Sequence, residues 1–136
     1  MGSRQTRQTH ILVVEDDPLV AGMLMDALGE EGHVVERAAN GRIALEMIEG
    51  RSYDLVVSDL RMPELDGVGL YEELVRRQPG LLTPLIFVTG SKEHPRYRCF
   101  LARTDAPVLS KPFNLGELQE LTRRLLSYDL REGEMR

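Results

Sequence analysis

The sequence predicts an α/β fold built on one parallel β-sheet with helices on both faces. Short apolar runs, typical of buried strands, alternate along the chain with longer segments whose apolar residues recur at helical spacing. Each helical segment separates two strands by a full crossover, which is the connection that parallel strands need. The chain has 136 residues, enough for one such domain with a sizeable core and too few for two.

The individual elements follow from the apolar runs and from residues that start or stop helices. A proline favours the first turn of a helix, an asparagine caps one, and a glycine or a Pro-Gly pair ends one. These signals occur at Pro18, Gly32, Asn40-Gly41, Pro79-Gly80, Pro95 and Asn114. The expected strands are residues 11–14, 33–38, 55–58, 85–88 and 108–109. The expected helices follow Pro18 and Gly41, then cover about 68–77, 93–103 and 114–128.

Composition and charge exclude several classes of function. A content of 42% hydrophobic and 29% charged residues is ordinary for a soluble globular protein. The net charge of -5 argues against direct contact with nucleic acid, which favours a basic surface. Cys99 is the single cysteine, so we expect no internal disulfide and a reducing, cytoplasmic location. No apolar stretch approaches the roughly 20 residues of a membrane span, so we expect no membrane contact by this domain.

Reactive side chains stand where four of the five strands end. Glu15, Asp16 and Asp17 follow the first strand, and Asp59 ends the third. Taken alone, each feature has an ordinary structural explanation, such as a helix cap or a turn. Parallel strands bring their carboxyl ends to one edge of the sheet, where open α/β sheets bind ligands. Because the fourth and fifth strands add Thr89 and Lys111 at the same edge, the set together indicates a functional site.

These residue types suit metal-assisted phosphoryl transfer. Carboxylates crowded at one edge repel each other unless a cation neutralises them, and Mg²⁺ prefers oxygen ligands of this kind. An aspartate beside such a metal can attack phosphorus and form an aspartyl phosphate. A metal, a lysine and a hydroxyl stabilise the charge on the transferring phosphoryl group. The sequence therefore predicts a Mg²⁺ site, with Mn²⁺ as a second possible metal.

Four motifs resemble those of one family. The stretches "ILVVEDDP", "VVSDLRMPELDG", "FVTG" and "LSKPF" are similar, in this order, to the motifs of receiver domains in two-component response regulators and hybrid histidine kinases. The resemblance covers about residues 10–128, leaving 1–9 as a disordered or cloning-derived tail and 129–136 as a C-terminal tail. It implies a flavodoxin-like, doubly wound, five-stranded sheet of order 2-1-3-4-5 with five helices. The implied partner is a histidine kinase or a histidine phosphotransfer protein, with an unknown downstream partner.

The resemblance also implies a role for each site residue. Asp59 is the implied phosphoacceptor, which makes the chain a signalling module that catalyses only its own phosphorylation and dephosphorylation. Asp17 matches no family role, so we expect it to cap a helix. The implied metal ligands are Glu15, Asp16, Asp59 and the backbone carbonyl of Arg61; the implied phosphate-binding and switch residues are Thr89, Gly90 and Lys111.

One departure from the family pattern concerns the output. The family usually carries tyrosine or phenylalanine three residues before the lysine, and Val108 stands there instead. The absence of a side chain at Gly90 leaves space above the phosphorylation site. In this family, the positions of Arg61 and Ser91 influence the attack of water on the aspartyl phosphate. We therefore expect phosphorylation to act without the movement of an aromatic ring at residue 108.

Three other functions are weaker alternatives. An aspartyl-phosphate phosphatase needs a second aspartate two residues after the nucleophile, where this chain has Arg61. A nucleotide-binding domain is supported only by Gly67-Val68-Gly69, which lacks a third glycine. A receiver-like domain that only binds partners would not need the complete acidic and basic set. The domain could be free-standing or belong to a hybrid sensor kinase.

Overall fold

The computed structural model describes residues 8–77 and 83–134, and side chains as far as residue 127. In this part of the chain, strands and helices alternate strictly: β1 (His10–Val14), α1 (Pro18–Glu30), β2 (Val34–Ala38), α2 (Gly41–Gly50), β3 (Leu55–Asp59), α3 (Gly67–Arg77), β4 (Leu85–Thr89), α4 (Pro95–Arg103), β5 (Val108–Ser110) and α5 (Leu115–Glu134). Most of the expected N-terminal tail and the Pro79-Gly80 signal lie outside the described residues.

The strands form one parallel sheet of order β2-β1-β3-β4-β5, which confirms the predicted topology. Strands β3 and β4, both interior to the sheet, are buried along their whole length. Burial on both faces explains why their sequences are continuous apolar runs rather than alternating ones. In register, Asp59 lies opposite Val88 and Thr89 lies opposite Ser110, so the reactive strand ends are level with one another.

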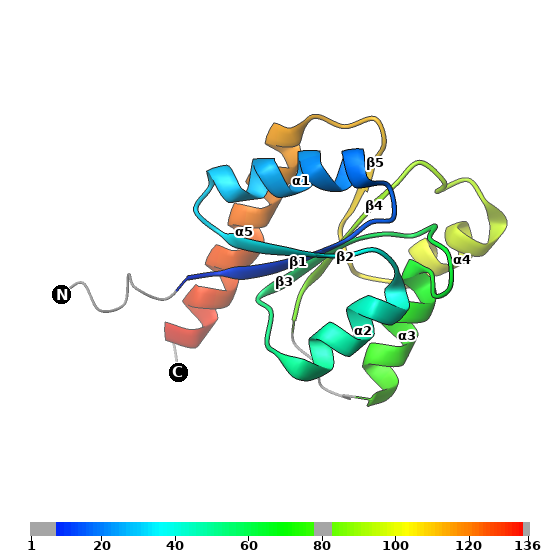
Figure 1. Ribbon diagram of the computed structural model, residues 1–136, viewed down its shortest axis with the longest axis horizontal. Coiled ribbons are helices and arrows are strands. Elements are labelled where there is room, and N and C mark those ends of the chain that lie inside the picture. Colours follow the sequence, from blue (N-terminus) through cyan, green and yellow to red (C-terminus); the bar gives the residue numbers. More distant parts are fainter. Residues whose placement is uncertain (1–7, 78–82, 135–136) are drawn as a thin grey trace.

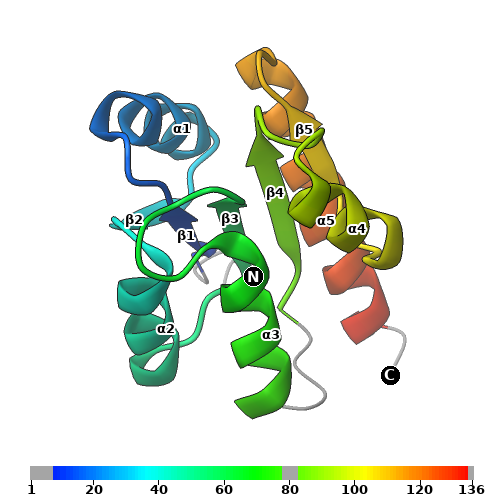
Figure 2. The ribbon, with the colours of Figure 1, turned by 90° about the vertical axis from the view of Figure 1, so that its right-hand side faces the viewer.

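Helices cover both faces of the sheet (Figure 1). Helices α1 and α5 lie on one face, and α2, α3 and α4 lie on the other, as the turned view also shows (Figure 2). Successive strand residues point to opposite faces, so Ile11 and Val13 pack toward α1 and α5. Leu12 and Val14 pack toward α2, α3 and α4. The sheet is therefore packed between two apolar layers, and polar side chains lie at the edge where the carboxyl ends of its strands meet.

Side-chain caps define the starts of the helices next to the site. Asp17 caps α1 through a hydrogen bond from the Leu19 N–H, as predicted, with an N···Oδ1 distance of 2.9 Å. Asn40 caps α2 by accepting from the Ile43 N–H. At α5, Asn114 and Glu117 bond each other's backbone N–H groups reciprocally, at 2.8 and 3.1 Å.

Some expected element bounds were wrong. Helix α4 begins at Pro95 and not at residue 93, because the His94 side chain caps it and Pro95 occupies its first position. Strand β2 begins at Val34, one residue later than expected. Helix α5 runs from Leu115 to Glu134. Among the described residues, no helix is both long and apolar enough to span a membrane.

Candidate functional site

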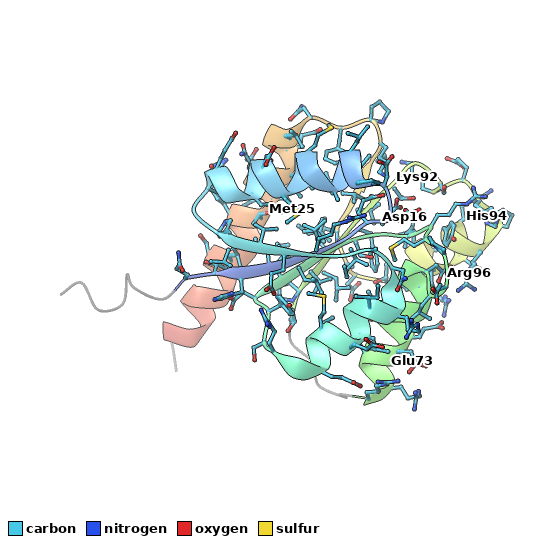
Figure 3. The ribbon with its side chains drawn as sticks, viewed as in Figure 1. Asp16, Met25, Glu73, Lys92, His94 and Arg96 are labelled. Atoms are coloured by element: carbon cyan, nitrogen blue, oxygen red, sulfur yellow. The ribbon has the colours of Figure 1, made fainter. Side chains whose placement is uncertain are left out.

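Three carboxylates meet where β1 and β3 end. Glu15, Asp16 and Asp59 each offer a carboxylate oxygen, and these atoms lie within 4.8 Å of one another. Glu15 and Asp59 are buried, with 2% and 7% of their surface exposed, whereas Asp16 faces solvent. Figure 3 labels Asp16 at the point where the chain leaves β1 for α1. The structure therefore brings Asp59 next to Glu15, which lies 44 positions earlier in the sequence, as the parallel topology predicted.

Lys111 supplies the positive charge of the site. Its Nζ lies 3.0 Å from Asp59 Oδ2 and 3.5 Å from Glu15 Oε1. Burial lowers the pKa of Lys111, but the hydrogen bond and the attraction of Asp59, followed by those of Glu15, outweigh this effect and hold the pKa above its ordinary value. The ammonium is therefore charged throughout the physiological pH range.

One cation does not remove the repulsion between the carboxylates. Burial raises the pKa of Glu15, and the negative charge of Asp59 raises it further. The Asp17 N–H, 3.1 Å from Glu15 Oε2, and Lys111 offset only part of this rise. A second cation at the three carboxylates would relieve the remaining repulsion, so the donor set fits a hard divalent metal that prefers oxygen ligands.

The loop between β3 and α3, residues 60–66, is folded back against Asp59. The Gly67 N–H donates to the Leu60 carbonyl at 2.8 Å, and the Arg61 N–H donates to Asp59 Oδ1 at 3.3 Å. A Cβ atom at Gly67 would lie 2.6 Å from the Asp59 carbonyl oxygen and 2.9 Å from the Leu60 Cα. Glycine is required here because the backbone of the loop passes too close to Asp59 for any side chain.

The same loop is bonded to α4 by an ion pair that no sequence motif indicates. Asp66, at the end of the loop, accepts two hydrogen bonds from Arg96, at 2.8 and 3.0 Å, and one from the Tyr97 hydroxyl at 3.2 Å. Burial raises the pKa of Asp66, but the bonds from Arg96, Gly69 and Tyr97 lower it by more, so its net pKa is below the ordinary value. Arg96 and the first turn of α4 are visible in Figure 3.

Thr89 and Gly90 lie at the end of β4, beside Lys111. Thr89 is fully buried, and its hydroxyl accepts a hydrogen bond from the Ser91 N–H at 2.9 Å. The Lys111 N–H donates to the Thr89 carbonyl at 2.8 Å, which ties the ends of β4 and β5 together. A Cβ atom at Gly90 would make only an ordinary contact with Lys111, at 3.7 Å, so packing does not require glycine here.

Val108 lies on the edge strand β5, is partly buried, and supplies no aromatic ring. It is opposite Phe87 in the β4–β5 register and packs into the apolar layer under α3 and α4. The aromatic contacts of that layer come from other elements: Phe100 of α4 meets the rings of Phe87 and Tyr71, each at 5.4 Å between centroids. On this face, the rings around Phe100 therefore come from α3, β4 and α4 and not from residue 108.

Comparison with known proteins identifies the class. The family model of the response regulator receiver domain matches residues 11–123. The chain belongs to this family, so it is a receiver domain of two-component signalling systems.

Its relatives include regulators and sensor kinases. The chain is 39% identical over 108 residues to the transcriptional regulatory protein TcrA of Mycobacterium tuberculosis, covering 79% of this chain and 42% of TcrA. It is 38% identical over 118 residues to the sensor kinase CckA of Brucella abortus, covering 85% of this chain and 12% of CckA. The chain thus spans less than half the length of these relatives.

A similar solved structure contains a metal. The receiver domain of the sensor histidine kinase PA1611 from Pseudomonas aeruginosa superimposes with a TM-score of 0.79 and 30% identity, covering 89% of this chain and 99% of that one. That structure has a magnesium ion coordinated in its active-site cleft.

Proposed function

We propose that this receiver domain accepts a phosphoryl group on the carboxylate of Asp59 from the phosphohistidine of a histidine kinase or a histidine phosphotransfer protein. The observation that carries the proposal is the position of Asp59. Its carboxylate lies within 4.8 Å of two further carboxylates and 3.0 Å from the ammonium of Lys111. This combination suits transfer of a doubly charged phosphoryl group, because its charge requires cations on more than one side.

The transfer needs no proton from Asp59. One of its carboxylate oxygens attacks phosphorus while the bond from phosphorus to the donor's imidazole nitrogen breaks, and that nitrogen keeps the electron pair and takes up a proton. Lys111 is placed to bind a phosphoryl oxygen as the charge moves from Asp59 to the new group. The hydroxyl of Thr89, which accepts from Ser91, keeps its own proton for donation to the same group.

We further propose that Glu15, Asp16, Asp59 and the carbonyl of Arg61 hold Mg²⁺, or Mn²⁺ in its place. The three carboxylates supply only oxygen ligands, as these metals prefer. When bound, the metal neutralises the carboxylates and the phosphoryl oxygens. The magnesium ion in the cleft of the PA1611 receiver domain supports the assignment.

The proposed output is a movement of the β4–α4 loop and the start of α4. Val108 is opposite Phe87 and has no ring to swing when the Thr89 hydroxyl turns toward a phosphoryl group. A mechanical link to α4 exists instead: Asp66, on the loop that follows Asp59, is bonded to Arg96 and Tyr97 in the first turn of α4. Charge changes at Asp59 can therefore bias the position of α4 through this loop.

In this proposal the domain acts in the cytoplasm, without touching DNA or a membrane itself. The exposed, unpaired Cys99 suits a reducing compartment, and the net charge of -5 disfavours nucleic acid. The match to CckA supports a place in a hybrid sensor kinase, and the match to TcrA supports a place in a response regulator. In either setting the domain ends its own signal by hydrolysis of the aspartyl phosphate.

Phosphoramidate, a small phosphoryl donor, tests the proposal without a kinase. Incubation with phosphoramidate and Mg²⁺ should add one phosphoryl group to the intact protein, as measured by mass spectrometry. Asp59→Asn should gain none, whereas Asp17→Asn, which removes a charge outside the carboxylate group, should be labelled normally. Equal labelling of Asp59→Asn and the unsubstituted protein would show that another residue is the acceptor.

A further inference from the structure

Arg37 reaches from β2 to the backbone that carries the acidic pair. Its Nε and Nη2 atoms donate to the carbonyl oxygen of Glu15, at 3.1 and 2.9 Å, and Nη2 also donates to the carbonyl oxygen of Asp16 at 3.1 Å. We propose that Arg37 is a positioning residue for the metal site, because it fixes the backbone that presents both carboxylates to a divalent cation. This inference rests on the proposed function of Glu15, Asp16 and Asp59 as metal ligands.

The partly buried Glu15 carbonyl needs a donor because the sheet ends beside it, whereas the bond to the Asp16 carbonyl is exposed. The β1–β2 register ends with Val14 opposite Ala38, and the Glu15 N–H makes one further bond to the Ala38 carbonyl at 3.1 Å. Beyond Ala38 the chain turns away toward the α2 cap, so the guanidinium of Arg37 stands where the next backbone donor of β2 would be. Backbone carbonyls away from water are normally paired in this way.

The position of Arg37 on its strand explains how it reaches this point. Val35, two residues earlier, packs toward α1 and α5, so Arg37 lies on the same face of β2. From there, the partly buried side chain runs along the edge strand to the turn between β1 and α1. The planar guanidinium can serve two carbonyls at once, which the single ammonium of lysine cannot do with the same geometry.

Hydrogen bonds hold the turn between β1 and α1 at both of its ends. At the α1 end, Asp17 caps the helix, and its own N–H donates to Glu15 Oε2 at 3.1 Å. At the β1 end, Arg37 donates to the carbonyls of Glu15 and Asp16. Without Arg37, the cost of ordering this backbone would have to be met when the metal binds, and the apparent metal affinity would fall.

The charge of Arg37 acts in the opposite direction to its positioning role. The hydrogen bonds of its guanidinium described above go to backbone carbonyls rather than to the carboxylates, so Arg37 leaves the carboxylates available to a metal while adding a positive charge nearby. If this charge were its main effect on metal binding, removing it would tighten Mg²⁺ binding. If positioning dominates, removing it weakens Mg²⁺ binding, so the sign of the change separates the two roles.

Calorimetric titration with Mg²⁺ alone gives this sign. We expect the dissociation constant of Arg37→Met to rise about tenfold, the usual size of the effect when a residue that orients metal ligands is lost. Arg37→Lys, which keeps the charge but not the fork of donors, should show most of the same rise. Arg51→Met is the matched control, because it also removes one arginine charge. The partner of Arg51, Glu36, lies on β2 but outside the group of three carboxylates. Arg51→Met should therefore bind Mg²⁺ normally.

Two further measurements exclude a merely structural role. In phosphoramidate labelling, the Mg²⁺ concentration for half-maximal rate should rise about tenfold in Arg37→Met, while the rate at saturating Mg²⁺ should stay unchanged. In metal-free buffer, amide exchange at residues 15–17 should be faster in both Arg37 variants than in Arg51→Met.

Unchanged or tighter Mg²⁺ binding by folded Arg37→Met or Arg37→Lys would overturn the proposal. An equal loss of affinity in Arg51→Met would overturn it as well. If the unsubstituted protein bound no Mg²⁺, both the metal site and this inference would be refuted. If it bound Mg²⁺ and either Arg37 variant bound the metal equally well, only this inference would be refuted.

Discussion

Asp16→Asn should make the metal-free protein more stable and its response to Mg²⁺ weaker. Asp16 belongs to a group of three carboxylates within 4.8 Å, it faces solvent, and it caps no helix. Removing its charge therefore removes repulsion from Glu15 and Asp59. The same change removes a proposed metal ligand, so stability and metal binding should move in opposite directions.

The distance gives the size of the effect. Two unit charges at the 4.8 Å limit of this group repel by about 1 kcal/mol in water and about 3.5 kcal/mol at an effective dielectric of about 20. Because Asp16 is exposed, the lower value applies to each of its two pairs, and screening by solvent and salt removes part of their sum. The free energy of unfolding should rise by about 1 kcal/mol, or about 3–5 °C in melting temperature for a chain of this size.

Urea unfolding, followed by far-ultraviolet circular dichroism in EDTA and in Mg²⁺, measures both effects. Saturating Mg²⁺ should stabilise the unsubstituted protein by about 2.7 kcal/mol at one hundred times the dissociation constant, and should stabilise Asp16→Asn less. Asp17→Asn is the control, since asparagine caps α1 as well as aspartate does and the residue lies outside the carboxylate group. No gain in stability in EDTA, or an equal gain from Mg²⁺ in Asp16→Asn, would refute the shared site.

Three further predictions concern the loop after Asp59 and the output. Asp66→Asn should lower the free energy of unfolding by about 1 kcal/mol near neutral pH. Because the pKa of Asp66 is lowered in the native state, this loss of stability should disappear as the pH falls below the ordinary value of 3.8 and through the native pKa. Urea titrations that show the same loss near neutral pH and below the native pKa would contradict this prediction. Gly67→Ala should cost about 2–3 kcal/mol, since its Cβ would meet backbone atoms, whereas Gly22→Ala, with open space around it, should be neutral or stabilising in the same titration. Beryllofluoride, which mimics the aspartyl phosphate, should change amide exchange mainly at residues 89–100 without producing a dimer in sedimentation; a clear shift from monomer to dimer would restore an output by dimerisation.

Local sequence signals were sufficient for the sheet and for the convergence of the site. The strands are short apolar runs, and their parallel order places Glu15, Asp59 and Lys111 at one edge without any knowledge of side-chain contacts. The caps at Asp17 and Asn114 were predictable for the same reason, because a cap depends on residues within one turn.

Contacts between distant residues were not predictable in this way. The Asp66–Arg96 pair joins residues 30 positions apart, and Arg37 bonds carbonyls 21 and 22 positions away. Neither pairing has a periodicity or a motif of its own, since each depends on how a loop packs against a neighbouring strand or helix. The start of α4 was misplaced because His94 caps it, and histidine is a weak capping signal in a sequence.

The most direct test of the central claim is to locate the phosphoryl group. Borohydride reduces an aspartyl phosphate to homoserine, so the protein can be phosphorylated by a histidine kinase or by phosphoramidate with Mg²⁺, reduced, and mapped by peptide mass spectrometry. Residue 59 alone should be converted, and chelation of Mg²⁺ before labelling should prevent the conversion. Conversion at Asp16 or Asp17 with residue 59 intact would contradict the account, as would no conversion at any aspartate under conditions that label a known receiver domain.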